Sequence, residues 1–402
     1  MDTPLEILLK GGRSYTGGRL KHLDILISAG KIQSMGEDIK PTNEKVIDCV
    51  GQIILPGLID AHVHMREPGL TQKEDFSTGS AAAAAGGVTT FLDMPNTRPP
   101  TLTAKDLTEK RSLASYKSHV NYGFHFGSSE SNIEEIKKAQ GVASTKVFMN
   151  ESTGQMKIDD DQKLGQIFAA SRMVMAHAEA EMMSKAATLS KKTGKKLHIA
   201  HVSTKEEVAW LEDNKTDNIT CEVTPHHLFL QADEGNPLMW VKPTLKTKED
   251  NSALLKAVNS GLIDTLGSDH APHLISEKLE KTTYGLPGVE TLLPLMLDAV
   301  NKKKTTLETV VRLCCENPAK IFGIKNKGFI REGYDADVVV VDMECEQTVD
   351  EKKLHSKCGW SPYTGWKLAG WPTTTIVGGA IVFADGKVDT SARGREISFI
   401  KI

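Results

Sequence analysis

The sequence has no CxxC pair, no long apolar run and no strong excess of charge of either sign. Its six cysteines, two of them adjacent, argue against a zinc ribbon or a disulfide framework and indicate reduced, mostly buried thiols. No apolar stretch approaches the roughly 20 residues of a membrane helix, and the start of the chain does not resemble a signal peptide. A net charge of -3 gives no electrostatic reason to bind nucleic acid or an anionic membrane. We therefore expect a cytoplasmic protein that binds neither.

The pattern of apolar runs predicts an α/β fold with two parts. Short β-type runs separated by glycine turns occupy the start of the chain and return after residue 317. Between them, helix-length segments separate strands that we expect at 53–60, 88–94, 119–126, 145–149, 172–178, 196–202, 219–225 and 262–268. This succession favours a (β/α)8 TIM barrel over an open sheet. We predict a barrel domain at residues 53–329 and a small composite β-sandwich domain from residues 1–52 and 330–402.

Two histidines follow the first barrel strand. The run at 53–60 is mostly apolar, as in a strand buried on both faces, and His62 and His64 stand at its end. Strand side chains alternate between faces, so this spacing aims both imidazoles the same way. Neutral imidazoles are common metal ligands. Surface or hydrogen-bonded histidines show the same spacing, so donors elsewhere in the chain must decide.

The ends of other predicted strands carry further donors. In a β/α barrel, reactive side chains come from the carboxyl ends of several strands. Those ends hold Lys146, His177, His201 and Asp269. Together with the HxH pair they are too many for one tetrahedral zinc, but they suit two metal ions that share ligands. Lys146 has no lone pair as an ammonium, so it is either an unrelated buried cation or a lysine carboxylated by carbon dioxide.

Several motifs in this order resemble dihydroorotase, of the amidohydrolase superfamily. They are DAHVHMREPG at 60–69, DMPNTRPPT at 93–101, KVFMNESTG at 146–154, CEVTPHHLFL at 221–230, GSDHAPHLISEK at 267–278 and GWSPYTGW at 359–366. The resemblance spans the barrel and part of the tail. It implies a β/α barrel with a composite β lobe, in agreement with the strand pattern.

The resemblance also implies a site and a reaction. It assigns two zinc ions per chain to a ligand set of His62, His64, Lys146 as N6-carboxylysine, His177, His201 and Asp269. Asp269 is also the catalytic residue, which exchanges a proton with the substrate. Arg66, Asn96 and His273 match residues that contact the substrate. The implied reaction is the reversible cyclisation of N-carbamoyl-L-aspartate to L-dihydroorotate in de novo pyrimidine biosynthesis.

The sequence also suggests roles for Lys242 and for residues 73–75. Many relatives carry Asn or Arg where Lys242 stands; lysine keeps a positive charge but not a bidentate fork, so Lys242 is only a candidate substrate contact. Residues 73–75, Lys-Glu-Asp, indicate the solvated start of the first barrel helix.

Two alternative functions stay open. Dihydropyrimidinase, hydantoinase and allantoinase resemble this chain in the same ligand framework, but act mostly on rings without a carboxylate and do not need Arg66. The other alternative is an inactive dihydroorotase-like scaffold for aspartate transcarbamoylase, which is expected to have lost ligands that this chain keeps. We expect a small-molecule substrate, and the sequence leaves a homodimer open.

Overall fold

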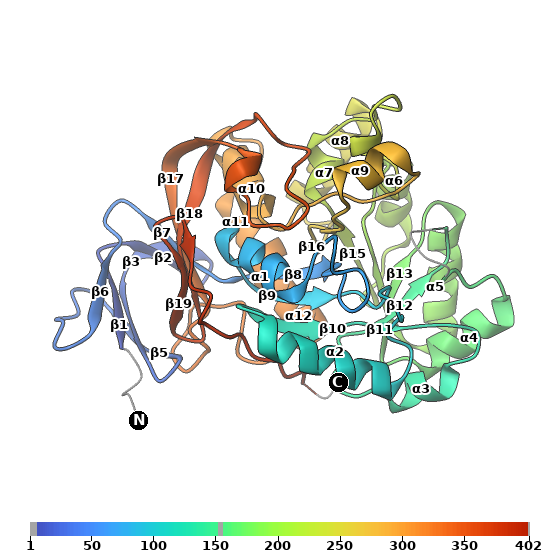
Figure 1. The fold of residues 1–402 in the computed structure, drawn as a ribbon, viewed down its shortest axis with the longest axis horizontal. Coiled ribbons are helices and arrows are strands. Elements are labelled where there is room, and N and C mark those ends of the chain that lie inside the picture. Colours follow the sequence, from blue (N-terminus) through green and yellow to red (C-terminus); the bar gives the residue numbers. More distant parts are fainter. Residues whose placement is uncertain (1–5, 152–155, 401–402) are drawn as a thin grey trace.

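The computed structural model describes residues 6–151 and 156–400. Its centre is a ring of parallel strands (Figure 1). These strands are β8 (Leu58–Val63), β9 (Val88–Asp93), β10 (Asn121–Phe124), β11 (Phe126–Gly127), β12 (Thr145–Phe148), β13 (Met173–His177), β14 (Lys196–Ile199), β15 (Ile219–Val223) and β16 (Thr265–Leu266). β10 and β11 form one strand position interrupted at His125. The ring closes where Val63 pairs in parallel with His270 and the His64 amide donates to the His270 carbonyl over 2.7 Å. The predicted barrel is confirmed.

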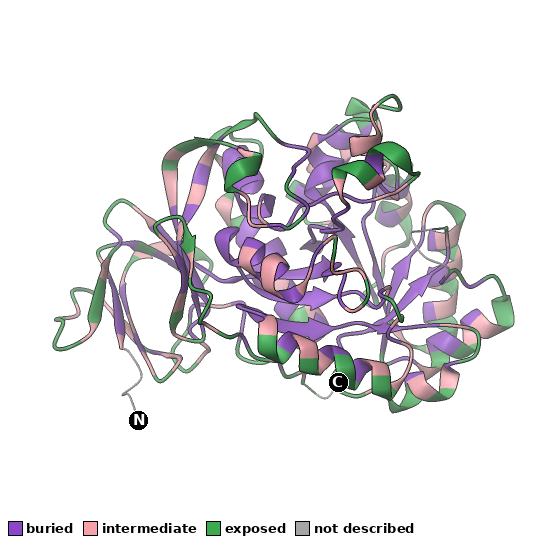
Figure 2. Cartoon of the chain, viewed as in Figure 1, coloured by how far each residue is buried: buried purple, intermediate pink, exposed green. Residues whose placement is uncertain are grey.

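Helices surround the strands and bury them. They are α1 (Phe76–Ala85), α2 (Ala104–Lys117), α3 (Ile133–Lys138), α4 (Asp161–Ala170), α5 (Glu181–Thr193), α6 (Lys205–Asn214), α7 (Pro225–Phe229), α8 (Lys248–Ser260), α9 (Ile275–Glu280), α10 (Leu292–Asn301), α11 (Leu307–Val311) and α12 (Asn317–Phe322). Short helical segments also occur at η1 (Pro237–Met239), η2 (Arg312–Glu316, a π-helix) and η3 (Glu351–Lys353). Figure 2 shows buried strands inside and exposed positions on the outward helix faces. Among the described residues, no helix has the length and apolarity needed to span a bilayer.

The second part of the molecule is a β lobe built from both ends of the chain (Figure 1, left). Its strands are β1 (Ile7–Lys10), β2 (Arg13–Thr16), β3 (Arg19–His22), β4 (Asp24–Ser28), β5 (Lys31–Gly36), β6 (Lys45–Asp48), β7 (Ile53–Pro56), β17 (Val338–Thr348), β18 (Lys367–Val377), β19 (Ala380–Ala384) and β20 (Lys387–Val388). They form one sheet in the order β5-β4-β1-β6 and another in the order β20-β19-β18-β17-β7-β2-β3. The exact domain bounds stay a prediction.

The predicted strand at 53–60 is wrong in one respect, because the structure divides it at Gly57. β7 pairs with β17 and β2 in the lobe, whereas β8 pairs with β9 in the barrel. A Cβ at Gly57 would lie 2.2 Å from the Thr89 hydroxyl oxygen, so the close approach of the two strands requires glycine here. The apolar run continues through this change of sheet, which is why periodicity alone did not reveal it.

The β7–β17 pair divides its side chains between two cores. Val338 and Val340 pack with Ile54 in the core of the lobe. The alternate residues of β17, Val339 and Val341, belong to the large core that the barrel strands and helices share. This period-two alternation joins lobe and barrel through one pair of strands. The six cysteines are free thiols, five of them buried, as expected.

Candidate metal centre

The barrel brings the predicted ligands to one end of its strands. His62 lies in β8 and His64 directly after it, Lys146 lies in β12, His177 ends β13, and His201 and Asp269 follow β14 and β16. Ser152–Gly154, the end of the KVFMNESTG motif, lie outside the described residues. The carboxyl end of a β/α barrel is where such folds carry their active sites.

Asp269 and the histidines are in mutual contact. Asp269 Oδ1 lies 3.0 Å from His64 Nε2 and 3.3 Å from His62 Nε2. His177 Nδ1 and His201 Nε2 are 2.8 Å apart. The ring of His62 joins the two pairs, since its centroid lies 5.5 Å from that of His64 and 5.4 Å from that of His201. Ligand atoms of His62, His201 and Asp269 all lie within 4.8 Å of one another, close enough to share a cation.

The backbone is strained where it presents these groups. His201 and Asp269 have φ of 41° and 44°, and Arg66, two residues after His64, has φ of 62°. Non-glycine residues in this left-handed region cost about 1–3 kcal/mol each and cluster at functional sites. The barrel therefore holds the two ligands and Arg66 in conformations that local preference opposes.

Burial determines the charge states of the site. It lowers the pKa of His64 to about 4 and that of His201 well below its ordinary value. Both imidazoles are therefore neutral at pH 7 and keep a lone pair for a metal. Burial alone would raise the pKa of Asp269, but the neighbouring His62 and His64 hold it well below its usual range. The aspartate is therefore an anion.

Several donor atoms at this site are buried without a hydrogen bond. They are His177 Nε2, His201 Nδ1 and Lys146 Nζ. Glu179 Oε1 lies 3.2 Å from His177 Nε2 without forming one. Buried polar atoms are rarely left unpaired in proteins, and a bound ion is one partner that such atoms can serve. Neutral imidazoles, an aspartate and unpaired buried nitrogens fit divalent metal ions.

Lys146 belongs to this buried group. Its Nζ lies 5.4 Å from the centroid of the Phe148 ring. Burial lowers the pKa of both His177 and His201, and the charge of Lys146 lowers it further. Burial lowers the pKa of Lys146 itself to about 8. A part of the population is therefore the neutral amine at physiological pH.

Two partners of the histidines fix their orientation. Glu222, fully buried on β15, lies 2.7 Å from His62 Nδ1, and Asn96 Oδ1 lies 2.7 Å from His64 Nδ1. Such contacts set the tautomer, leaving the other ring nitrogen to bind a metal. Glu222 is a partner of the site that was not predicted from the sequence. A carboxylate inside the apolar run CEV of a central strand was the available signal.

Arg66 lies beside the metal-binding group and contacts His273. The guanidinium is buried; its Nε donates to the Pro272 carbonyl over 3.0 Å, and its Nη2 lies 3.0 Å from His273 Nε2. Lys242 is further out, with its Nζ 4.9 Å from the centroid of the Tyr284 ring. It lines a cavity of 510 Å³ with Asn150 and Glu179. That Arg66, Asn96, Lys242 and His273 bind substrate stays a prediction.

The interpretation of residues 73–75 as a helix start is confirmed, because Asp75 is the N-cap of α1 and accepts from the Thr78 amide, but the expectation that this start is solvated is wrong. Glu74 is fully buried, where it accepts hydrogen bonds from Thr78 and Ser356. Lys73 pairs with Glu277 over 3.2 Å and lies 3.1 Å from His273 Nδ1. The segment at 349–366 covers this helix start, and the local sequence around residues 73–75 does not predict that contact.

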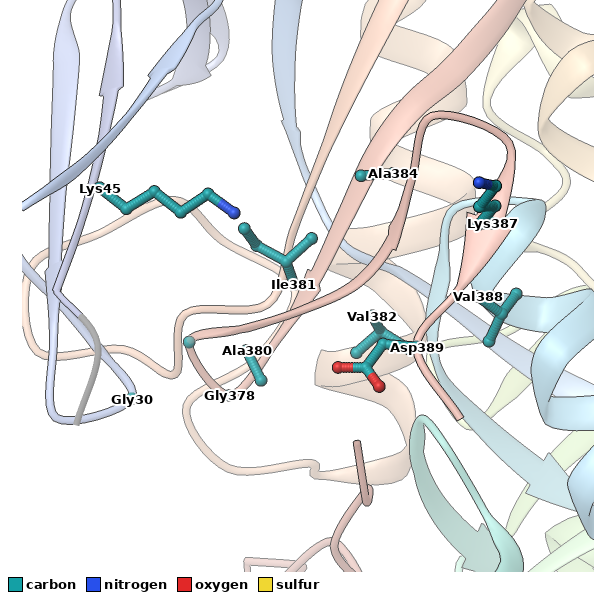
Figure 3. A pocket seen from close by; sticks show the side chains of 11 residues that line it. Gly30, Lys45, Gly378, Ala380, Ile381, Val382, Ala384, Lys387, Val388 and Asp389 are labelled. Atoms are coloured by element: carbon teal, nitrogen blue, oxygen red, sulfur yellow. The ribbon is translucent and has the colours of Figure 1, made fainter. Parts of the chain in front are cut away.

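Another hollow, of 590 Å³, lies in the β lobe (Figure 3). Its wall consists of Gly30, Lys45 and residues between 378 and 389, and its charged side chains are Lys45, Lys387 and Asp389. Because this wall carries no histidine, cysteine or buried acid, it lacks the donor set described above.

Comparisons with known proteins agree with this site and fold. The Amidohydrolase family model matches residues 53–382. A protein named dihydroorotase from Methanosarcina acetivorans is 36% identical over 96% of this chain and 93% of its own. A dihydroorotase from Pyrococcus furiosus is 38% identical over 92% and 91%. The curated relatives thus match nearly end to end.

Solved structures share the whole architecture. An L-hydantoinase (dihydropyrimidinase) from Arthrobacter aurescens superposes with a TM-score of 0.93 at 29% identity, over 98% of this chain and all of that one. A dihydropyrimidinase from Brevibacillus agri gives a TM-score of 0.90 at 25% identity, over 99% of this chain and all of that one. With a family model that matches most of its length and full-length relatives above 30% identity, this chain belongs to the amidohydrolase family, alongside members named dihydroorotase.

Proposed function

We propose that this metal-dependent cyclic amide hydrolase is a dihydroorotase, which interconverts N-carbamoyl-L-aspartate and L-dihydroorotate in pyrimidine biosynthesis. The observation that carries the proposal is the buried Arg66 beside the metal-binding group, with its Nη2 3.0 Å from His273. Dihydroorotate carries a carboxylate on its ring, and a guanidinium can bind such a group through two parallel hydrogen bonds. Relatives named dihydroorotase, at 36% and 38% identity, support the same substrate.

A hydantoinase or dihydropyrimidinase is the second candidate. The structural match to a hydantoinase favours it, but the sequence identity of that match is 29%, lower than the identity to the dihydroorotases. Rings without a carboxylate give the buried Arg66 charge no partner. An uncompensated buried cation is costly, so the presence of Arg66 supports an anionic substrate.

We further propose that two zinc ions would be held by His62, His64, His177, His201, Asp269 and Lys146, the last as N6-carboxylysine. The neutral amine of Lys146 would add carbon dioxide and release one proton, which turns the side chain into an anion. Its buried Nζ, which has no hydrogen-bond partner, supports this assignment. When bound, the zinc ions would neutralise and polarise the carboxyl or amide group that reacts.

The side chains of this chain would orient the substrate and move its proton. Arg66 and His273 would bind the free carboxylate and keep it away from the reacting carbon. Asp269, which its histidine neighbours keep ionised, would accept a proton during hydrolysis and return it to the departing ring nitrogen. Glu222 would keep His62 in one tautomer.

Substrate preference tests the function. Turnover of L-dihydroorotate should exceed that of dihydrouracil, hydantoin and allantoin at equal concentration. Preference for any of the other three would overturn the proposal. For the inactive scaffold, elemental analysis discriminates: two metal ions per chain support the enzyme, and none after purification without chelators supports the scaffold. The candidate contact of Lys242, the homodimer and the cytoplasmic location stay predictions.

A further inference from the structure

His273 is held rigidly beside Arg66. The residue is 1% exposed, and the Trp360 indole donates to its carbonyl over 2.7 Å. The Tyr284 carbonyl lies 3.1 Å from its Nε2. Lys278 fixes that carbonyl in turn, because its ammonium donates to the carbonyls of both neighbours, Thr283 and Gly285, over 3.2 and 3.0 Å. The ring of His273 therefore has a fixed orientation, and the groups around it decide which nitrogen carries the proton.

Lys73 decides the state of Nδ1. Its ammonium lies 3.1 Å from His273 Nδ1 and has only donors to offer. Nδ1 must therefore accept, which leaves the proton on Nε2, where it can be donated to the Tyr284 carbonyl. Glu277 does not compete, since its Oε2 lies 3.6 Å from Nδ1 but 3.2 Å from Lys73 Nζ.

The other states of the ring fit less well. A proton on Nδ1 would let Nε2 accept from Arg66 Nη2, but it would face the Lys73 ammonium and would remove the hydrogen bond to the Tyr284 carbonyl, so this tautomer satisfies one of the three contacts where the Nε2–H tautomer satisfies two. A doubly protonated ring would place a third positive charge between Arg66 and Lys73. Burial, followed by the charges of those two residues, lowers the pKa of His273 to about 2, in keeping with a neutral ring.

The neutral Nε2–H tautomer of His273 places two hydrogen-bond donors side by side. Arg66 Nη2 and the protonated Nε2 of His273 lie 3.0 Å apart, and neither can accept from the other. A carboxylate offers lone pairs to both. We propose that Lys73 is a positioning residue, which holds His273 as the neutral Nε2–H tautomer so that His273 and Arg66 together bind the carboxylate of the substrate. The identity of that substrate rests on the proposed function, whereas the tautomer does not.

Nitrogen NMR of ¹⁵N-histidine-labelled protein tests the tautomer directly. The His273 signal is identified by its loss in the variant His273→Asn. In the unmodified protein we expect a protonated Nε2 and an unprotonated Nδ1. In Lys73→Met the proton should move towards Nδ1, because Glu277 no longer has an ammonium to pair with. Lys73→Arg keeps a donor and should keep the original tautomer.

Kinetics test the consequence. Lys73→Met should raise KM for dihydroorotate about tenfold, as for the loss of one charge-assisted hydrogen bond, and change kcat by less than about threefold. The matched control is Lys357→Met, because Lys357 pairs with Asp75 over 2.6 Å near the same helix start. That variant should match the unmodified enzyme in both measurements.

The possible outcomes distinguish a failure of this proposal from a failure of the proposed function. A protonated Nδ1 in the unmodified protein would overturn the role of Lys73 even if Lys73→Met did not fold. An unchanged KM in a folded Lys73→Met variant would do so as well. If the protein did not turn over dihydroorotate at all, the proposed function would fail, and the spectrum would still decide the tautomer.

Discussion

At the scale of single residues, Lys146 gives the sharpest test of the metal site. Lys146→Ala removes the side chain proposed to bridge the metals, so we expect kcat to fall more than about a hundredfold and the metal content to drop below two ions per chain. Short carboxylic acids such as acetate should restore part of the activity, because they can occupy the space of the carbamate. Steady-state kinetics with elemental analysis checks both results.

Lys205→Ala is the matched control for that experiment. Lys205 is exposed at the start of α6, and its loss should leave activity and metal content unchanged. Full activity in Lys146→Ala would remove the bridge from the mechanism.

Arg66 gives a test of substrate choice. Arg66→Met should raise KM for dihydroorotate roughly a hundredfold, because two charge-assisted hydrogen bonds to the carboxylate are lost. Turnover of dihydrouracil, which has no carboxylate, should change by less than about threefold. Arg111→Met, which removes an arginine that pairs with Glu396 on the surface of α2, should behave as the unmodified enzyme. Equal losses on both substrates would contradict a carboxylate contact.

The sequence predicted positions for the donors but not their surroundings. The strand-end rule and the dihydroorotase motifs indicated His62, His177 and Asp269 because strand ends can be read from apolar runs. Glu222 was not predicted because its contact with His62 joins two residues that are 160 positions apart in the sequence. The error at Glu74 has the same cause, since its cover, Ser356, lies 282 residues further along the chain.

At the scale of elements, the segment between β17 and β18 contributes to the site. Ser356 reaches Glu74 at the start of α1, Trp360 donates to the carbonyl of His273, and the segment is anchored where His355 Nδ1 lies 2.8 Å from Glu290 Oε1. A strand connection of the lobe thus covers part of the barrel mouth.

The His355–Glu290 anchor predicts a pH dependence of stability. Its hydrogen bond with Glu290, opposed by burial, raises the pKa of His355 above the ordinary 6.5. A raised pKa means that the pair stabilises the fold fully below pH 6.5 and that this contribution is lost as pH rises through the folded-state value. The difference in Tm between the unmodified protein and His355→Gln should therefore be larger at pH 6 than at pH 9, by roughly 1–2 °C.

Calorimetry at the two pH values measures that difference. His22→Gln, at an exposed position at the end of β3, is the control and should show little difference at either pH. A His355→Gln effect of equal size at pH 6 and pH 9 would show that the anchor does not titrate.

Strand positions were the most predictable part of the fold. The expected strands at 88–94, 172–178 and 219–225 correspond to β9, β13 and β15 within two residues at each end. Fully buried parallel strands give continuous apolar runs, which are easy to locate. The change of sheet at Gly57 was not predictable, because β7 and β8 are both buried strands and differ only in their distant partners.

At the scale of the whole molecule, the proposed reaction fixes a response to pH. Closure of the N-carbamoyl-L-aspartate dianion to the dihydroorotate monoanion and water consumes one proton. The equilibrium ratio of cyclic to open form should therefore fall about tenfold for each unit rise in pH while both carboxylates are ionised. Chromatography of equilibrated mixtures between mildly acidic and mildly alkaline buffers measures the ratio, and a constant ratio would refute the assigned reaction.

The β7–β17 pair has a consequence for any attempt to make a smaller enzyme. Truncation of the chain before Val338 would remove β17 and leave one edge of β7 without a hydrogen-bonded partner strand. It would also expose apolar residues of both cores, because Val338 packs in the core of the lobe and Val339 in the core of the barrel. The unpaired strand β7 ends at Pro56, two residues along the chain from the start of β8, the strand that carries His62. Such a fragment should aggregate when it is produced in cells, so we expect that the barrel cannot be expressed as a folded domain without the C-terminal strands of the lobe.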